Sequence, residues 1–117
     1  MSKTINILET IEKIVHRDKR YKIDAYNFVL ESLNYTVRKF KKSRHVTGKE
    51  LLEGIKEYAK EQFGPMARTV FEHWGVKTTE DFGNIVFSLV DAKILSKTEQ
   101  DSIEDFRDVY SFEEVFD

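Results

Sequence analysis

The centre of the chain holds the pattern that most constrains its fold, a helix signal at each end of one amphipathic stretch. Thr47 is followed three residues later by Glu50, the spacing of a capping box, in which each side chain bonds the backbone of the other residue. Gly64 and Pro65 follow the stretch. Glycine suits a left-handed helix cap, and proline suits the first turn of a new helix. The sequence therefore predicts a helix over 47–63 and another helix directly after it.

Apolar residues also recur at the spacing of a buried helix face in most of the remaining chain. After Leu95 this pattern weakens, and the segment 96–117 is compatible with short helices or with a small hairpin. The helices predicted outside 47–63 are 5–15, 24–41, 66–74 and 79–92, followed by a short helix over 102–109 and one helical turn at 112–116.

The chain has 117 residues, one proline and no Gly/Ser-rich linker, which is typical of one domain. We expect a mainly α, single-domain fold over 1–117, an orthogonal bundle of about five helices with an irregular C-terminal segment that forms a short helix or a small hairpin. Phe40 lies on the apolar face of the second predicted helix and is expected to be buried. The predicted core contains Ile11, Phe28, Leu33, Leu52, Ile55, Phe63, Val70, Phe71, Trp74, Phe82, Ile85, Val86 and Leu89.

Composition excludes several classes of protein. The absence of cysteine excludes disulfide bonds, thiol catalysis and cysteine-ligated metal sites. The first residues contain no long apolar run, so no signal peptide is expected. No apolar run approaches the roughly 18 residues that a membrane span needs. We therefore expect a cytoplasmic protein without membrane contact.

Charge is divided between the two parts of the chain, although the formal net charge is only −2. Residues 1–60 carry fourteen Lys/Arg and eight Asp/Glu, whereas residues 61–117 carry five and thirteen. Such a division is typical of a partner surface, and also of oppositely charged parts that face each other within a fold or across a dimer. The basic cluster comprises Arg38, Lys39, Lys41, Lys42, Arg44 and His45, and the acidic segment 99–114 includes Glu99, Asp101, Glu104 and Asp105.

The basic cluster and the acidic segment are the first candidate interaction surface. Arg20 and Tyr21 are added to it, because Arg and Tyr are frequent in binding hot spots. A structural role is the favoured interpretation of this region, with Asp24 as the N-cap of the second helix and Arg20 near it. The leading hypothesis is a non-enzymatic protein-interaction module that binds a protein partner or a second copy of itself.

Nucleic-acid binding is the alternative function, because the basic cluster has enough positive charge to attract phosphates. A winged-helix-like arrangement over 47–110 would make 79–92 the reading helix. That helix begins with Glu80 and Asp81, whose charges repel phosphates, and the whole chain is acidic. Nucleic acid is therefore the disfavoured partner.

No catalytic or metal-binding motif occurs in the sequence. The three histidines, His16, His45 and His73, lack the spacing of metal ligands. The carboxylates of the acidic segment resemble a calcium loop only in charge, because the glycine that an EF-hand requires is missing. We expect no enzyme activity, no cofactor and no bound metal.

Gly54 and Gly83 lie inside predicted helices, where glycine costs about 1 kcal/mol relative to alanine. A glycine in such a place allows another backbone or an aromatic ring to come close. We expect the neighbour to be part of the same chain, and a close homodimer contact is the alternative.

Six segments resemble an uncharacterised family of small bacterial proteins, the Minf-type domain of unknown function. They cover nearly the whole chain in the family's order. The resemblance implies a bacterial source and a single domain, and it implies no activity, cofactor or catalytic residue. The segments are RYxxDAYxFV at 20–29, RHVTGxELL at 44–52, FGPMA at 63–67, WGV at 74–76, TxDFGxIVF at 79–87 and KTExDSxEDF at 97–106.

Overall fold

The computed structural model describes residues 3–41 and 45–116. The fold is mainly α, as predicted, and no strand occurs in these two ranges, so the C-terminal segment forms short helices and not a hairpin. The elements are α1 (Lys3–Arg17), α2 (Ile23–Lys39), α3 (Gly48–Phe63), the 3-10 turn η1 (Gly64–Met66), α4 (Ala67–His73), α5 (Thr79–Asp91), the 3-10 turn η2 (Ile103–Phe106) and α6 (Phe112–Phe116).

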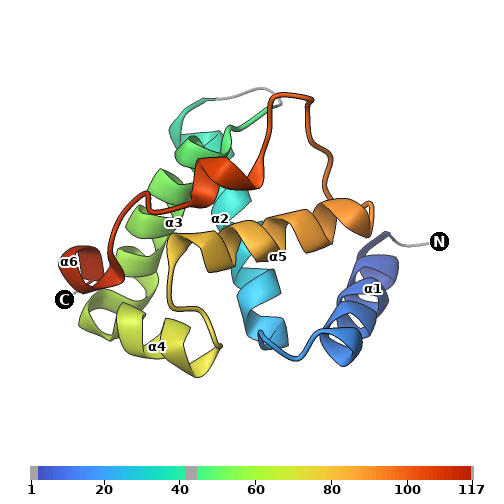
Figure 1. Ribbon diagram of the computed structural model, residues 1–117, viewed down its shortest axis with the longest axis horizontal. Helices are drawn as coiled ribbons and strands as arrows, with labels where there is room; N and C mark the ends of the chain where they lie inside the picture. Colours follow the sequence, from blue (N-terminus) through green and yellow to red (C-terminus); the bar gives the residue numbers. More distant parts are fainter. Residues whose placement is uncertain (1–2, 42–44, 117) are drawn as a thin grey trace.

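The helices cross at steep angles around one core. Figure 1 shows α5 running across α2, with α1 near the C-terminal end of α5 and with α3, α4 and α6 grouped at the other side. Helices α2 and α3 have the most extensive contact, and η2 packs on both α3 and α5. The last part of the chain therefore folds back over the middle of the bundle.

Two capping boxes fix where the central helices begin. The amide of Glu50 donates to the Thr47 hydroxyl at 3.1 Å, and the amide of Thr47 donates to the Glu50 carboxylate at 2.9 Å. Thr78 and Asp81 form the same pair at the start of α5. Each such cap stabilises a helix by about 0.5–2 kcal/mol. Both starts were predicted from sequence and are confirmed.

The core is aromatic-rich, with Phe71 of α4 at its centre. Among the predicted core residues, Leu33, Phe63, Val70, Trp74 and Val86 are only partly buried, and the others are buried. Beyond that list, the C-terminal turns dock further rings on the core. These additional buried aromatic residues are Phe106, Phe112 and Phe116, together with Tyr21 and Tyr26.

Two local predictions on α2 are wrong. Phe40 is 36% exposed, because α2 ends at Lys39 and Phe40 is its C-cap, beyond the last buried residue of the helix, Thr36. Asp24 is not the N-cap. The helix starts at Ile23 after Lys22, and Asp24 lies in the first turn, where its charge is favourable against the helix dipole.

Gly54 allows α3 to approach α2 closely. A Cβ atom at position 54 would lie 1.7 Å from the hydroxyl oxygen of Thr36. Thr36 is fully buried and donates this hydroxyl to the carbonyl of Ser32 at 2.7 Å. The neighbour of Gly54 is thus the same chain, as expected, although it is a threonine and not a phenylalanine ring.

Gly54→Ala is expected to lower the free energy of unfolding by about 1–3 kcal/mol, because the added methyl group must push α3 away from α2. Adding Thr36→Ala removes the nearest clashing atom, so the double variant should recover part of the loss. Urea unfolding of both variants and of Thr36→Ala alone measures the coupling. A Gly54→Ala protein as stable as the wild type would contradict the close approach.

Candidate functional site

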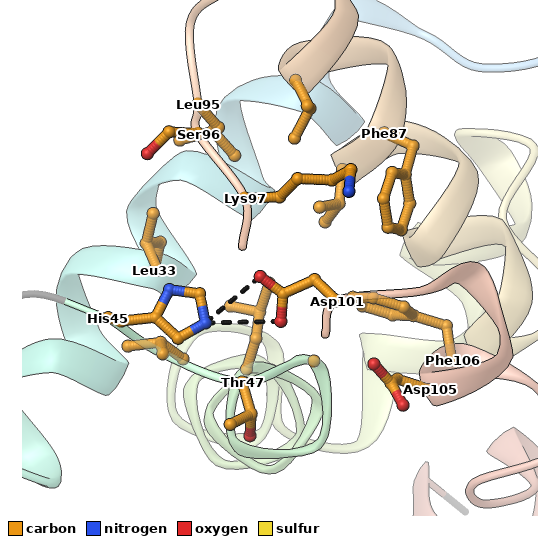
Figure 2. A pocket seen from close by; sticks show the side chains of 15 residues that line it. Leu33, His45, Thr47, Phe87, Leu95, Ser96, Lys97, Asp101, Asp105 and Phe106 are labelled. Atoms are coloured by element: carbon orange, nitrogen blue, oxygen red, sulfur yellow. Dashed lines mark hydrogen bonds and ion pairs between the residues drawn. The ribbon is translucent and has the colours of Figure 1, made fainter. Parts of the chain in front are cut away.

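A pocket of about 150 Å³ opens between α2, α3, α5 and the segment 95–106. Figure 2 shows His45 and Asp101 pointing toward each other, with the Phe106 ring beside Asp101. The polar lining residues of the pocket, which also include Thr47 and Lys97, are exposed or half-buried and form a rim. The apolar lining residues are buried or half-buried and form a floor, mainly Leu33, Leu51, Val86, Val90, Leu95 and Phe106.

Two interactions hold the C-terminal wall of this pocket in place. The buried hydroxyl of Thr79 donates to the carbonyl of Phe106 at 2.6 Å and accepts from the amide of Val109 at 3.2 Å. A Cβ atom on Gly83 would lie 2.7 Å from Phe106 and from Ile103, so the missing side chain lets η2 sit directly on α5. Gly83 therefore packs on an aromatic ring of its own chain, as expected.

The His45–Asp101 contact joins the basic cluster to the acidic segment. The imidazole Nε2 lies 3.2 Å from one carboxylate oxygen and 3.3 Å from the other. The Thr98 amide also donates to Asp101, at 2.8 Å. Burial raises the pKa of Asp101, but the Thr98 amide and His45 outweigh it, so this pKa lies below its usual value. The two oppositely charged segments therefore meet within one chain at this pair.

The other described residues of the basic cluster lie at the end of α2. These residues, Arg38, Lys39 and Lys41, are exposed. Lys39 forms an ion pair with Glu57 on α3. Lys42 and Arg44 lie outside the described residues. The cluster is thus partly compensated by carboxylates from two other elements.

The remaining acidic candidates have mostly local roles. Glu99 is exposed, and Glu104 forms an ion pair with Arg107. The carboxylate of Asp105 accepts from the Ser102 amide at 3.1 Å and so caps η2. Asp101 and Asp105 both line the pocket, whereas Glu99 and Glu104 do not.

Arg20 and Tyr21 are not part of this site. Arg20 is exposed and forms an ion pair with Asp18 at 2.8 Å. Tyr21 is only 3% exposed. Its hydroxyl donates to Asp81 and accepts from Asn84, and burial raises its pKa. The use of Tyr21 as a surface contact is therefore wrong, because tertiary hydrogen bonds hold it inside the core.

The winged-helix-like alternative also lacks its main elements. In 3–41 and 45–116 there is no strand to form a wing. Helix α5, the predicted reading helix, is covered by α2 and η2. Its buried residues include Phe82, Ile85 and Leu89, so it is a central core helix.

Three comparisons, with protein-family models, with curated proteins and with solved structures, gave no match. The resemblance to the Minf-type family thus stays a prediction. Within the described ranges, no group of three or more His, Cys, Asp or Glu residues is placed to hold a metal ion. Across the same residues, no helix combines the length and the apolar character of a membrane span.

Asp101→Asn is expected to lower the free energy of unfolding at pH 7 by about 0.5–1 kcal/mol, because it removes a carboxylate charge that the Thr98 amide and His45 hold in a partly exposed site. The folded-state pKa of Asp101 is below the unfolded value, so this contribution is present above about pH 4 and is lost as the pH falls through the folded-state pKa. The wild type and the variant should therefore converge in acid. Urea unfolding over pH 2.5–7 measures this, with Glu99→Gln as the control, and a difference that persists in acid would contradict the ionic origin.

Proposed function

We propose that the protein is a non-enzymatic protein-interaction module that accepts one apolar side chain of a partner protein in the pocket between α2, α3, α5 and 95–106. The observation that carries this proposal is the apolar floor surrounded by a polar rim. This is the anatomy of a hot-spot pocket, in which an anchor side chain is desolvated at the centre and polar groups surround it.

The size of the pocket favours a side chain over a cofactor. Its volume is about 150 Å³, and an apolar cavity of about this size holds a group as large as benzene. Sites for cofactors and drug-sized ligands are larger, about 300–1,000 Å³. A leucine, methionine or phenylalanine side chain fits the smaller volume. The partner protein in this proposal can also be a second copy of this chain.

The hydrogen bonds of His45 favour binding over nucleophilic catalysis. In a catalytic triad the imidazole lies between a carboxylate and a nucleophilic hydroxyl or thiol. Here Asp101 supplies the carboxylate. No hydroxyl of the described residues is hydrogen-bonded to the imidazole, and the chain has no cysteine. The pair is therefore better suited to holding the rim of the pocket.

Filling the pocket should abolish partner binding. Val90→Phe places a ring into the apolar space that the partner side chain would occupy. Tagged wild type and Val90→Phe are compared by affinity purification from the cells that make the protein, with quantitative mass spectrometry. Any specific partner should fall at least tenfold with Val90→Phe. Val109→Phe, which adds the same ring at an exposed position outside the pocket, should keep the partner.

Equal recovery with wild type and Val90→Phe would contradict the proposed site. Circular dichroism and thermal unfolding of both variants separate lost binding from lost folding. Sedimentation of the wild type and of Val90→Phe over a range of concentrations tests the case in which the partner is a second copy.

We expect no specific nucleic-acid binding. The basic cluster is interrupted by carboxylates at the Lys39–Glu57 and His45–Asp101 contacts, which reduce the attraction of phosphates. Titration with double-stranded DNA and single-stranded RNA at 50 and 200 mM salt measures this. Tight binding at low salt that falls about 10³-fold or more over this range would indicate multiple phosphate contacts and would favour the alternative function.

A further inference from the structure

A second depression lies where α2 meets the C-terminal ends of α3 and α4, and it shares no lining residue with the first pocket. We call it the aromatic basin. Its volume is about 310 Å³. Three aromatic side chains come from three different helical segments, and two carboxylates come from α2. The basin is lined by Phe28, Phe63, Trp74, Asp24, Glu31, Asn27 and Gln62.

The three rings form a closed triangle. The ring centroids of Phe28 and Phe63 are 5.6 Å apart, those of Phe28 and Trp74 are 5.6 Å apart, and those of Phe63 and Trp74 are 5.7 Å apart. Phe28 is buried, whereas Phe63 and Trp74 are only partly buried and present ring surface to the basin. Aromatic faces carry negative electrostatic potential and attract cations that lie within about 6 Å.

The charges of the basin have one sign. Asp24 and Glu31 are seven residues apart on α2, which places them two turns apart on the same face of the helix. Both are exposed, and the Tyr58 hydroxyl donates to Glu31 at 3.1 Å. No Lys, Arg or His is among the residues that line the basin. An occupant with a positive charge would therefore meet two carboxylates and aromatic surface, with no opposing cation in the lining.

We propose that the aromatic basin binds the cationic side chain of an Arg or Lys residue in a partner peptide. The apolar stem of the side chain would lie on the Phe63 and Trp74 rings, and the charged end would pair with Asp24 or Glu31. Arg suits the aromatic basin best, because its planar guanidinium both stacks on aromatic rings and donates to carboxylates. This site is independent of the first pocket and does not depend on what binds there.

Trp74 makes the proposal directly testable, because it is the single tryptophan of the chain. The probe is the tripeptide acetyl-Ala-Arg-Ala-amide, and the matched control replaces Arg with citrulline, which has nearly the same shape but no charge. Fluorescence emission of Trp74 and its indole N–H resonance are followed during titration. We expect a saturable change with the Arg peptide at millimolar concentrations or below, and at least fivefold weaker binding of the citrulline peptide.

Variants of the two basin carboxylates test whether the Arg peptide binds in the basin. Glu31→Gln and Asp24→Asn should each weaken binding of the Arg peptide about threefold to tenfold, and the double variant should weaken it further. Both residues are exposed, so folding should be kept, and circular dichroism checks this. Glu99→Gln removes the same charge from an exposed residue outside the basin and should leave binding unchanged.

Three results would overturn the proposal. One is the absence of any saturable change in either Trp74 signal up to 20 mM Arg peptide. Another is equal binding of the Arg and citrulline peptides, which would show that charge is not recognised. The third is binding that is the same in the double variant and in the wild type, which would place the peptide elsewhere.

Discussion

The packing around Phe71 is the interaction on which the rest of the structure depends. This ring is fully buried and comes from α4, a helix of seven residues that could not be stable alone. It contacts Phe28 of α2, Phe82 of α5, and both Phe112 and Phe116 of α6 at centroid distances of 5.2–5.7 Å. Aromatic contacts of this kind contribute about 0.5–1.5 kcal/mol each beyond the area they bury. One side chain thus joins the N-terminal, central and C-terminal parts of the chain.

Both candidate sites follow from this arrangement. On one side of Phe71, the Phe28, Phe63 and Trp74 rings continue outward and become the floor of the aromatic basin. Phe71 also packs on Phe82 of α5, and the Thr79 hydroxyl of α5 donates to the carbonyl of Phe106 in η2. That attachment places the C-terminal wall of the first pocket. The sites are therefore extensions of the core and are not separate loops added to it.

The sequence predicted what depends on near neighbours in the chain. The capping box of Thr47 and Glu50 involves residues three apart, and its geometry is contained in the sequence pattern. The His45–Asp101 contact joins residues 56 apart, and no local signal indicates that the segment after Leu95 returns to α3. Tyr21 was wrongly predicted to lie on the surface for the same reason, because Asp81, which accepts from its hydroxyl, is 60 residues away.

The floor and the rim of the first pocket differ in how firmly they are held. Its floor residues, such as Leu51 and Val86, belong to long helices that pack against the core. Its rim residues lie in loops, where exposed hydrogen bonds such as Thr98 to Asp101 contribute only about 1 kcal/mol each. Segments with few buried contacts open locally at low free-energy cost. In the proposed complex, the floor supplies the apolar contact at little ordering cost, and the loops of the rim bear most of any rearrangement.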